Sequence, residues 1–228
     1  MSINAVKKEA TMKPADLLEQ HAAAWQAATR HPFLDSVREG TLAPQSFATW
    51  LVQDYLFVTD EFTVQAHLLP SAPRYAQNLL IRNVAALEAE LTWFEAKAKE
   101  LNLSLSTAPH SVTAAYGTFM KTLEQRPFAA AMTATWAIER AYLEAWQSAL
   151  PGQPIYREYI ERWTNPGFAS FVEELEQTTA LALESGGADK EAEAAFLEVA
   201  ELERAFWDMA WSPGGQSLPH GQKFPGSA

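Results

Sequence analysis

Three carboxylates of this chain occupy positions where helices normally carry apolar side chains. Glu139 lies in the stretch MTATWAIERAYLEAW, Asp54 in the segment that follows Pro44, and Glu203 near the C-terminal end. At 100° per residue each acid falls within an arc of apolar side chains that holds no Lys or Arg. The arcs are Met132, Thr135, Trp136, Leu143 and Trp146; Phe47, Trp50, Leu51, Phe57, Val58 and Leu68; and Phe196, Val199, Phe206, Trp207 and Ala210. Because an unpaired buried carboxylate is costly, three of them favour a pocket over a salt-bridged core.

The chemistry of such a pocket follows from its residue types. Aromatic side chains would stack against a flat heterocycle, and a carboxyl group whose pKa is raised by burial would bond or protonate a ring nitrogen or amine. Two acids in different surroundings would divide the work, one protonating a leaving group and one activating water. The pattern predicts hydrolytic loss of an amine or amide from a nitrogen-rich ring. Any one of these acids, taken alone, would more often be a core residue bonded to a Trp or Tyr.

Other chemistries lack their motifs. The chain has no cysteine, which excludes thiolate metal sites and a Cys nucleophile. Its five histidines show neither Glu-x-x-His nor His-x-x-x-His spacing, so we expect no metal. No G-x-S-x-G, P-loop or G-x-G-x-x-G motif is present, and we expect no cofactor.

Composition restricts the partners and the compartment. The net charge of -11 argues against nucleic-acid binding. The N-terminus has no apolar signal region and no apolar run is long enough for a membrane span, so we expect a cytoplasmic protein without membrane contact. A length of 228 residues with no linker-like stretch predicts one domain over 1–228, with a core at about 14–211 and an irregular tail at 212–228.

The start and stop residues along the chain are those typical of helices. No segment alternates with period two, so the sequence predicts an all-α fold. Proline starts, cap residues and glycine stops predict helices at 14–29, 32–39, 44–69, 73–101, 107–125, 127–149, 166–186 and 188–211, with Ser106 or Thr107 capping the fifth. In the Glu139 helix a stripe of small residues predicts close approach by a neighbouring helix; it consists of Ala130, Ala134, Ala137, Ala141 and Ala145. Two acids lie beside the apolar arc of the helix at 73–101. Glu88 is expected to face solvent, and whether Glu90 is buried or exposed stays undecided.

Several stretches resemble the TenA/thiaminase II family. They are HPFLDSVREGTLAPQSFATWLVQDYLFV, TWAIERAYLEAW, WTNPGF and ERAFWDMAW, in the family's order over about residues 14–211. The resemblance implies a single-domain helical bundle of the haem-oxygenase type, a homodimer or homotetramer, and a pocket for aminopyrimidine moieties of thiamin.

The resemblance assigns roles to individual positions. Asp54 matches the acid that binds the pyrimidine, Tyr116 matches a pocket tyrosine, and Glu203 matches the catalytic glutamate. Ala134 stands where classical members carry a nucleophilic cysteine, and Phe57 and Ile138 stand where tyrosines are usual. These departures, together with W-A-I-E ending at Glu139 and the E-L-x-W-F-E stretch at residues 90–95, resemble the cysteine-less TenA_E branch. That branch implies hydrolysis of amino- or formylamino-pyrimidine breakdown products of thiamin.

The resulting hypothesis gives each residue a task. Asp54 holds the aminopyrimidine, Glu203 protonates the departing amine, and Glu139 activates water or orients Glu203. The ring-binding surface is predicted to consist of Tyr116, Trp163, Phe57 and Trp136. The alternatives are a non-catalytic heterocycle-binding module, a cofactor-independent oxidase, which would need histidines and basic residues in its pocket, and a structural dimer without a small-molecule site.

Overall fold

A computed structural model describes residues 12–212, and the regular structure within that range is helical, without a strand. The all-α prediction is thereby confirmed for this part of the chain. The α-helices are α1 (Pro14–Gln20), α2 (Ala22–Thr29), α3 (Pro32–Glu39), α4 (Pro44–Leu68), α5 (Arg74–Glu100), α6 (Ser111–Thr122), α7 (Phe128–Ser148), α8 (Arg157–Thr164), α9 (Pro166–Gly186) and α10 (Asp189–Trp211). The irregular tail predicted at 212–228 lies, beyond Ser212, outside the described residues.

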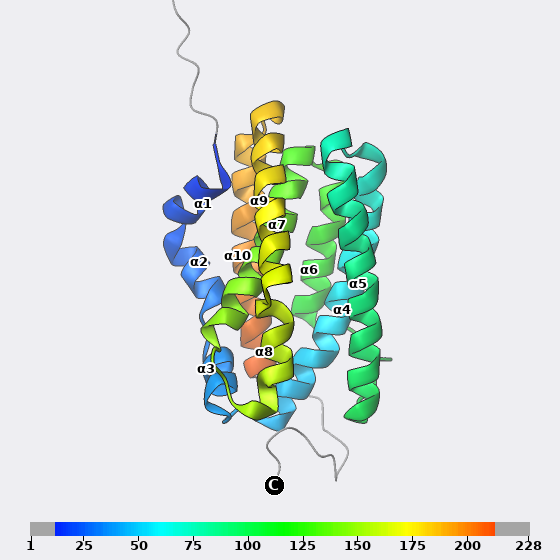
Figure 1. Cartoon of the computed structure of the whole chain (residues 1–228), viewed down its shortest axis with the longest axis vertical. Coiled ribbons are helices and arrows are strands. Elements are labelled where there is room, and N and C mark those ends of the chain that lie inside the picture. Colours follow the sequence, from blue (N-terminus) through cyan, green and yellow to red (C-terminus); the bar gives the residue numbers. More distant parts are fainter. Residues whose placement is uncertain (1–11, 213–228) are drawn as a thin grey trace, which may run out of the picture.

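The long helices run along the long axis of the molecule, and α1 to α3 follow one another down one side (Figure 1). Helix α7 is central, since it packs against α2, α8, α9 and α10, while α5 packs mainly against α4. The predicted small-residue stripe of α7 is fully buried, which lets α9 and α10 approach its backbone closely. No helix within residues 12–212 is long and apolar enough to cross a membrane.

Several helix ends form as their residues dictate. Gly40 ends α3 in the left-handed conformation at φ 74°, which a residue without Cβ adopts at low cost. Pro44 occupies the first turn of α4, where its missing N–H leaves no bond unmade. The Asn165 side chain caps α9 by accepting a hydrogen bond from the Phe168 N–H at 3.0 Å. These three predicted boundaries are confirmed.

Two predicted boundaries are wrong. The helix expected at 14–29 is broken at His21, whose φ of -114° and ψ of 29° are not helical and whose Nε2 lies 2.8 Å from Glu193 Oε1 of α10. This break lets α2 turn and pack on α10. Helix α6 begins at Ser111 and is capped by His110, because Pro109 has no N–H to offer a cap at Ser106. The short helix α8 was not predicted.

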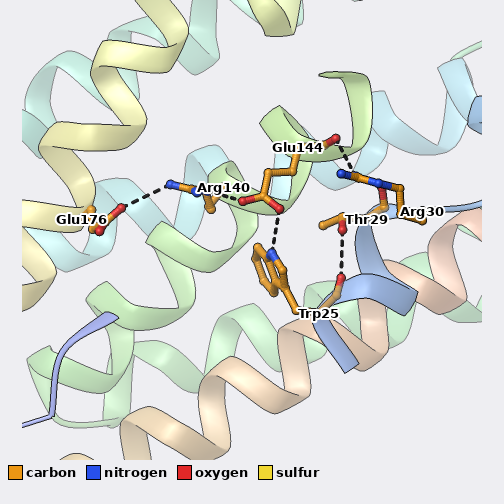
Figure 2. A network of polar contacts seen from close by, with 6 residues as sticks. All are labelled: Trp25, Thr29, Arg30, Arg140, Glu144 and Glu176. Atoms are coloured by element: carbon orange, nitrogen blue, oxygen red, sulfur yellow. Dashed lines mark hydrogen bonds and ion pairs between the residues drawn. The ribbon is translucent and has the colours of Figure 1, made fainter. Parts of the chain in front are cut away.

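A polar network holds α7 against its neighbours on the side of α2 and α9 (Figure 2). Glu144 of α7 accepts hydrogen bonds from Trp25 Nε1 of α2 at 2.9 Å and from Arg140 Nε at 2.5 Å. Arg140 also reaches Glu176 of α9 at 3.3 Å. Because Arg140 directly follows Glu139, these contacts fix the backbone that carries the central acid.

Candidate active site

Two adjoining cavities lie where α4, α5, α7 and α8 meet. The outer cavity has a volume of about 670 Å³. The inner cavity has a volume of about 20 Å³, enough for about one water molecule. Both are lined by Leu87, Glu90, Glu139 and Trp163, so these residues form the junction between them. The inner cavity is completed by Asp54, Phe57, Val58, Glu61, Ile138 and Tyr142.

Asp54 is held by a chain of hydrogen bonds on the floor of the inner cavity. The Tyr142 hydroxyl donates to Asp54 Oδ2 at 2.5 Å and accepts from Trp50 Nε1 at 3.0 Å. Burial raises the pKa of Asp54 well above its usual range, although the bond from Tyr142 opposes the shift. Asp54 is therefore oriented by α7 and tends to keep its proton.

Glu139 projects from α7 at the junction and is surrounded by other acids. Burial raises its pKa well above the usual range, and the charges of Glu61, Glu90 and Glu203 raise it further. The pKa of Glu61 is raised by its own burial and by the charge of Glu90. Within the described part of the chain, no basic side chain lines the inner cavity. Burial and mutual repulsion therefore favour the protonated forms of Glu61 and Glu139.

Glu90 differs from Glu139 because a cation, Arg162, favours its ionised form. Its pKa is raised by burial, but the charge of Arg162 and the hydrogen bond from Trp163 Nε1 at 2.9 Å both lower it. The Arg162 guanidinium lies 4.3 Å from the Trp93 ring centroid and lines the outer cavity. The pKa values of both acids at the junction are raised, that of Glu139 well above its usual range, and the shift of Glu90 is opposed by Arg162 and Trp163.

Glu203 and Tyr116 form a buried pair one layer behind the inner cavity. The Tyr116 hydroxyl donates to Glu203 Oε1 at 2.7 Å, and burial raises the pKa of Glu203 to about 7 against that bond. The Tyr116 ring packs edge-on against Phe57 at 4.7 Å between centroids, and it is Phe57 that lines the cavity. Glu203 acts on Asp54 and Glu139 through its charge, which raises the pKa of both.

The predicted site residues thus fall into two groups. Asp54, Glu139, Phe57 and Trp163 meet at the cavities, whereas Glu203 and Tyr116 are buried behind Phe57. The Tyr116 hydroxyl is bonded to Glu203 and its ring packs against Phe57, and its contact with a substrate ring stays a prediction.

Trp136 is elsewhere in the core. Its ring stacks near Trp25 and Phe196 at centroid distances of 6.5 and 6.0 Å, and it does not line either cavity. The face of α7 that carries Trp136 is directed at α2 and α10, away from both cavities, and a contact of Trp136 with a ligand stays a prediction without support from this position.

Three residues at the cavities were not predicted from the sequence: Tyr142, Arg162 and Asn83. Asn83, Leu87 and Glu90 are spaced i, i+4 and i+7 on α5, which places them on one face toward the cavities. That spacing was the signal by which Asn83 could have been found. Within residues 12–212 no three His, Asp or Glu side chains are arranged to hold a metal ion.

The fold and the site define an all-helical protein with a secluded cavity lined by carboxyl groups and aromatic rings. Residues 18–212 match the model of the TENA/THI-4/PQQC family, and the chain belongs to this family. It is 31% identical over 207 residues to a "Probable bifunctional TENA-E protein" of Glycine max, covering 85% of this chain and 90% of that relative.

Two further comparisons agree with this membership. The chain is 27% identical over 218 residues to an "Aminopyrimidine aminohydrolase" of Halalkalibacterium halodurans, with 87% of this chain and 95% of the relative covered. Its structure is similar to that of a TenA homologue from Pyrococcus furiosus, with a TM-score of 0.83 and 29% identity over 88% of this chain and all of the other.

Proposed function

We propose that this protein is a metal-free hydrolase of thiamin salvage. Its substrates are aminopyrimidine breakdown products of thiamin that carry an amine or formylamine, and its product is the hydroxymethyl aminopyrimidine. The observation that carries the proposal is the junction at which Glu139 and Glu90, two buried acids of which only Glu90 has a cation nearby, face a cavity that ends on Asp54. The aminohydrolase relative supports the same reaction class.

Asp54 is suited to bind an aminopyrimidine because its carboxyl group and the ring nitrogen can share one proton in a hydrogen bond. A neutral carboxyl group donates to a ring nitrogen and accepts from the neighbouring exocyclic amine, and a carboxylate beside a protonated ring has the same two bonds. The raised pKa of Asp54 keeps this proton available, and Tyr142 fixes the carboxyl group. The ring lies against Trp163 and Phe57. Because the inner cavity holds about 20 Å³, the ring enters edge first and side chains at the junction move.

The reaction then takes place at the junction. Glu90, whose ionised form is favoured by Arg162 and Trp163, accepts a proton from the attacking water. Glu139, which keeps its proton, donates to the departing nitrogen. Glu203 sets the proton affinity of Asp54 and Glu139 from behind Phe57, in place of the direct proton transfer expected from the sequence.

Glu139→Gln tests the proposal. The substitution keeps the shape of the side chain and removes its transferable proton, so kcat for aminomethyl-pyrimidine should fall on the order of a hundredfold or more. Glu88→Gln is the matched control, because Glu88 is exposed on α5 and should be silent. Full turnover by Glu139→Gln would remove Glu139 from the mechanism. A wild-type protein that binds the pyrimidine calorimetrically without converting it would be a binding module.

The proposal extends to organisation and location. The buried side chains of α1 to α10 form one continuous core, which supports a single domain, and the family resemblance supports a homodimer or homotetramer. Absence of cysteine fits a cytoplasmic protein. Sedimentation velocity at micromolar concentration tests the assembly, and a monomer there would contradict it. Cell fractionation tests the location.

A further inference from the structure

Glu61 is a buried acid of the inner cavity to which the proposed reaction gives no task. The residue projects from α4, is 4% exposed and lines the inner cavity together with Asp54 and Glu139. Among residues 12–212, no Lys, Arg or His side chain lines this cavity or contributes to the shifted pKa of Glu61. A buried carboxyl group without a cation is costly to ionise, so its place in the cavity requires a physical reason.

Gln65 holds the Glu61 carboxyl group from the next turn of α4. Its Nε2 donates a hydrogen bond to Glu61 Oε1 at 3.3 Å, and Gln65 is 2% exposed. The amide oxygen of Gln65 has no hydrogen-bond partner within the described residues. Because an amide has a donor side and an acceptor side, it can serve Glu61 in both protonation states: Nε2 donates to the carboxylate, and after a half-turn the oxygen accepts from the protonated acid. Gln65 thus orients Glu61 without supplying a charge.

The position of Glu61 along α4 places it beside the substituent of the substrate. Asp54 and Glu61 are seven residues apart, so they lie on one face of the helix, about 10 Å apart along its axis. Phe57 and Val58 line the cavity between them. Among the neighbouring acids, Glu61 has the largest effect on the pKa of Glu139. A ring that lies against Phe57 and is bound by Asp54 therefore directs its substituent toward Glu61 and Glu139.

The ligand group that fits an acid held in this way is an ammonium group. A primary amine on a methylene carbon is protonated at neutral pH, as the lysine side chain is. A hydrogen bond from an ammonium group to a carboxylate is about twice as strong as one between neutral groups. The hydroxymethyl product offers an O–H at the same place but carries no charge. Resting on the function proposed above, we propose that Glu61, held by Gln65, is the counter-ion of the substrate's ammonium group and makes the cavity prefer the amine substrate to the hydroxymethyl product.

Binding of the ammonium group then displaces a proton from the site. Burial and the charge of Glu90 raise the pKa of Glu61 to about 8, so near pH 7 the empty site holds this acid mainly protonated. When the ammonium group arrives, Glu61 ionises and its proton passes to solvent. Within the complex a proton can exchange between the ligand nitrogen and Glu61, so the nitrogen lone pair stays available to Glu139. None of the other titratable groups around Glu61 is a cation; they are Asp54 of α4, Glu90 of α5, Tyr116 of α6, Glu139 and Tyr142 of α7, and Glu203 of α10.

Calorimetry in buffers of different ionisation enthalpy measures both the affinity and the protons released. The ligands are aminomethyl- and hydroxymethyl-pyrimidine, and every protein carries Glu139→Gln so that the amine is not consumed. Glu61→Gln, Gln65→Met and Asp60→Asn are each added to this parent. Asp60 is the matched control, because it is the neighbouring acid on α4, pairs with Lys121 at 2.9 Å and lines neither cavity.

Glu61→Gln should weaken binding of the amine on the order of thirtyfold and change that of the hydroxymethyl ligand less than about threefold. The protons released by the amine should fall from about one per ligand to near zero. Asp60→Asn should match the parent. Equal losses on both ligands, unchanged affinity for the amine, or unchanged proton release would overturn the inference.

Gln65→Met provides a second variant, which decides the question if Glu61→Gln does not fold. It keeps the length of the side chain and removes the amide, so affinity for the amine should fall on the order of fivefold, with the hydroxymethyl ligand unaffected. Equal affinity of this variant and the parent for the amine would contradict the proposed arrangement. The failure of the proposed function is visible separately, because wild-type protein that does not hydrolyse the amine refutes hydrolysis, whereas the binding comparison needs no turnover.

Discussion

Replacing Glu203 by Gln should make the protein more stable at alkaline pH. Glu203 is 3% exposed and accepts a hydrogen bond from Tyr116, and burial raises its pKa from 4.5 to about 7. Glutamine resembles the protonated form, since it can still accept from the tyrosine and carries no charge. The variant therefore retains what wild-type Glu203 loses on ionisation.

The sign and size of this change in stability with pH follow from proton linkage. Between pH 4.5 and 7 the unfolded chain releases the Glu203 proton while the folded protein keeps it, so the free energy of unfolding falls as pH rises. Across the whole window the loss is about 3 kcal/mol, at about 1.4 kcal/mol per pH unit. The contribution is fully present below pH 4.5 and lost above pH 7. In the Gln variant this loss is absent.

The measurement is urea unfolding followed by tryptophan fluorescence, from pH 5.5 to 8.5 at constant ionic strength. The lower limit keeps the protein away from its isoelectric point of about 4.9. Over this range the stability of Glu203→Gln relative to wild type should rise by about 2 kcal/mol, which corresponds to about 4–8 °C in Tm. Glu201→Gln, an exposed position on the same helix, should show no such trend. A difference between Glu203→Gln and wild type that is constant with pH would refute the reasoning.

Three further substitutions test other contacts of the site. Tyr142→Phe removes the hydroxyl between Trp50 and Asp54, so calorimetry should show affinity for aminopyrimidine reduced on the order of tenfold; unchanged affinity would mean that Asp54 needs no orientation. Trp163→Phe keeps a ring but removes the donor to Glu90, which should raise the pKa of Glu90 and shift the acidic limb of the kcat/KM profile to higher pH, whereas an unmoved limb excludes Glu90 as the base. Ala134→Cys should create neither thiaminase activity nor a thiol that reacts quickly with disulfide reagents, because Ala134 is fully buried and lines neither cavity; rapid modification would disprove this.

The sequence was sufficient to predict that particular acids are buried but insufficient to predict what they face. Helical periodicity identified Asp54, Glu139 and Glu203 as inward-facing, and all three are buried. An arc on one helix does not say which neighbour it meets, however. Glu139 and Trp136 share an arc of α7, yet only the acid reaches the cavity, while the indole packs against α2 and α10.

The parts of the site that escaped prediction depend on tertiary contacts. Helix α8 has only eight residues, too few for a clear periodic pattern, yet it brings Trp163 to the junction and Arg162 to the outer cavity. Tyr142 appeared unremarkable on its own helix, because its importance lies in the hydroxyl that links α4 to α7. Asn83 is buried at the outer cavity beside Glu139, and periodicity along α5 does not reveal which side chains of α7 it meets.

The acid cluster also explains why a cationic, nitrogen-rich ligand fits this cavity. Among residues 12–212 no cation lines the inner cavity, so holding Asp54, Glu61 and Glu139 together there favours their protonated forms. A ligand that is protonated on its ring or amine supplies the positive charge that the site lacks, and so allows one acid to ionise without repulsion from its neighbours. A carboxylate ligand would instead add to that repulsion. The burial of these acids, which lowers the free energy of unfolding as pH rises, therefore also favours a cationic ligand in the inner cavity. The positive charge of Arg162, which lines the outer cavity, restricts this preference to the inner cavity.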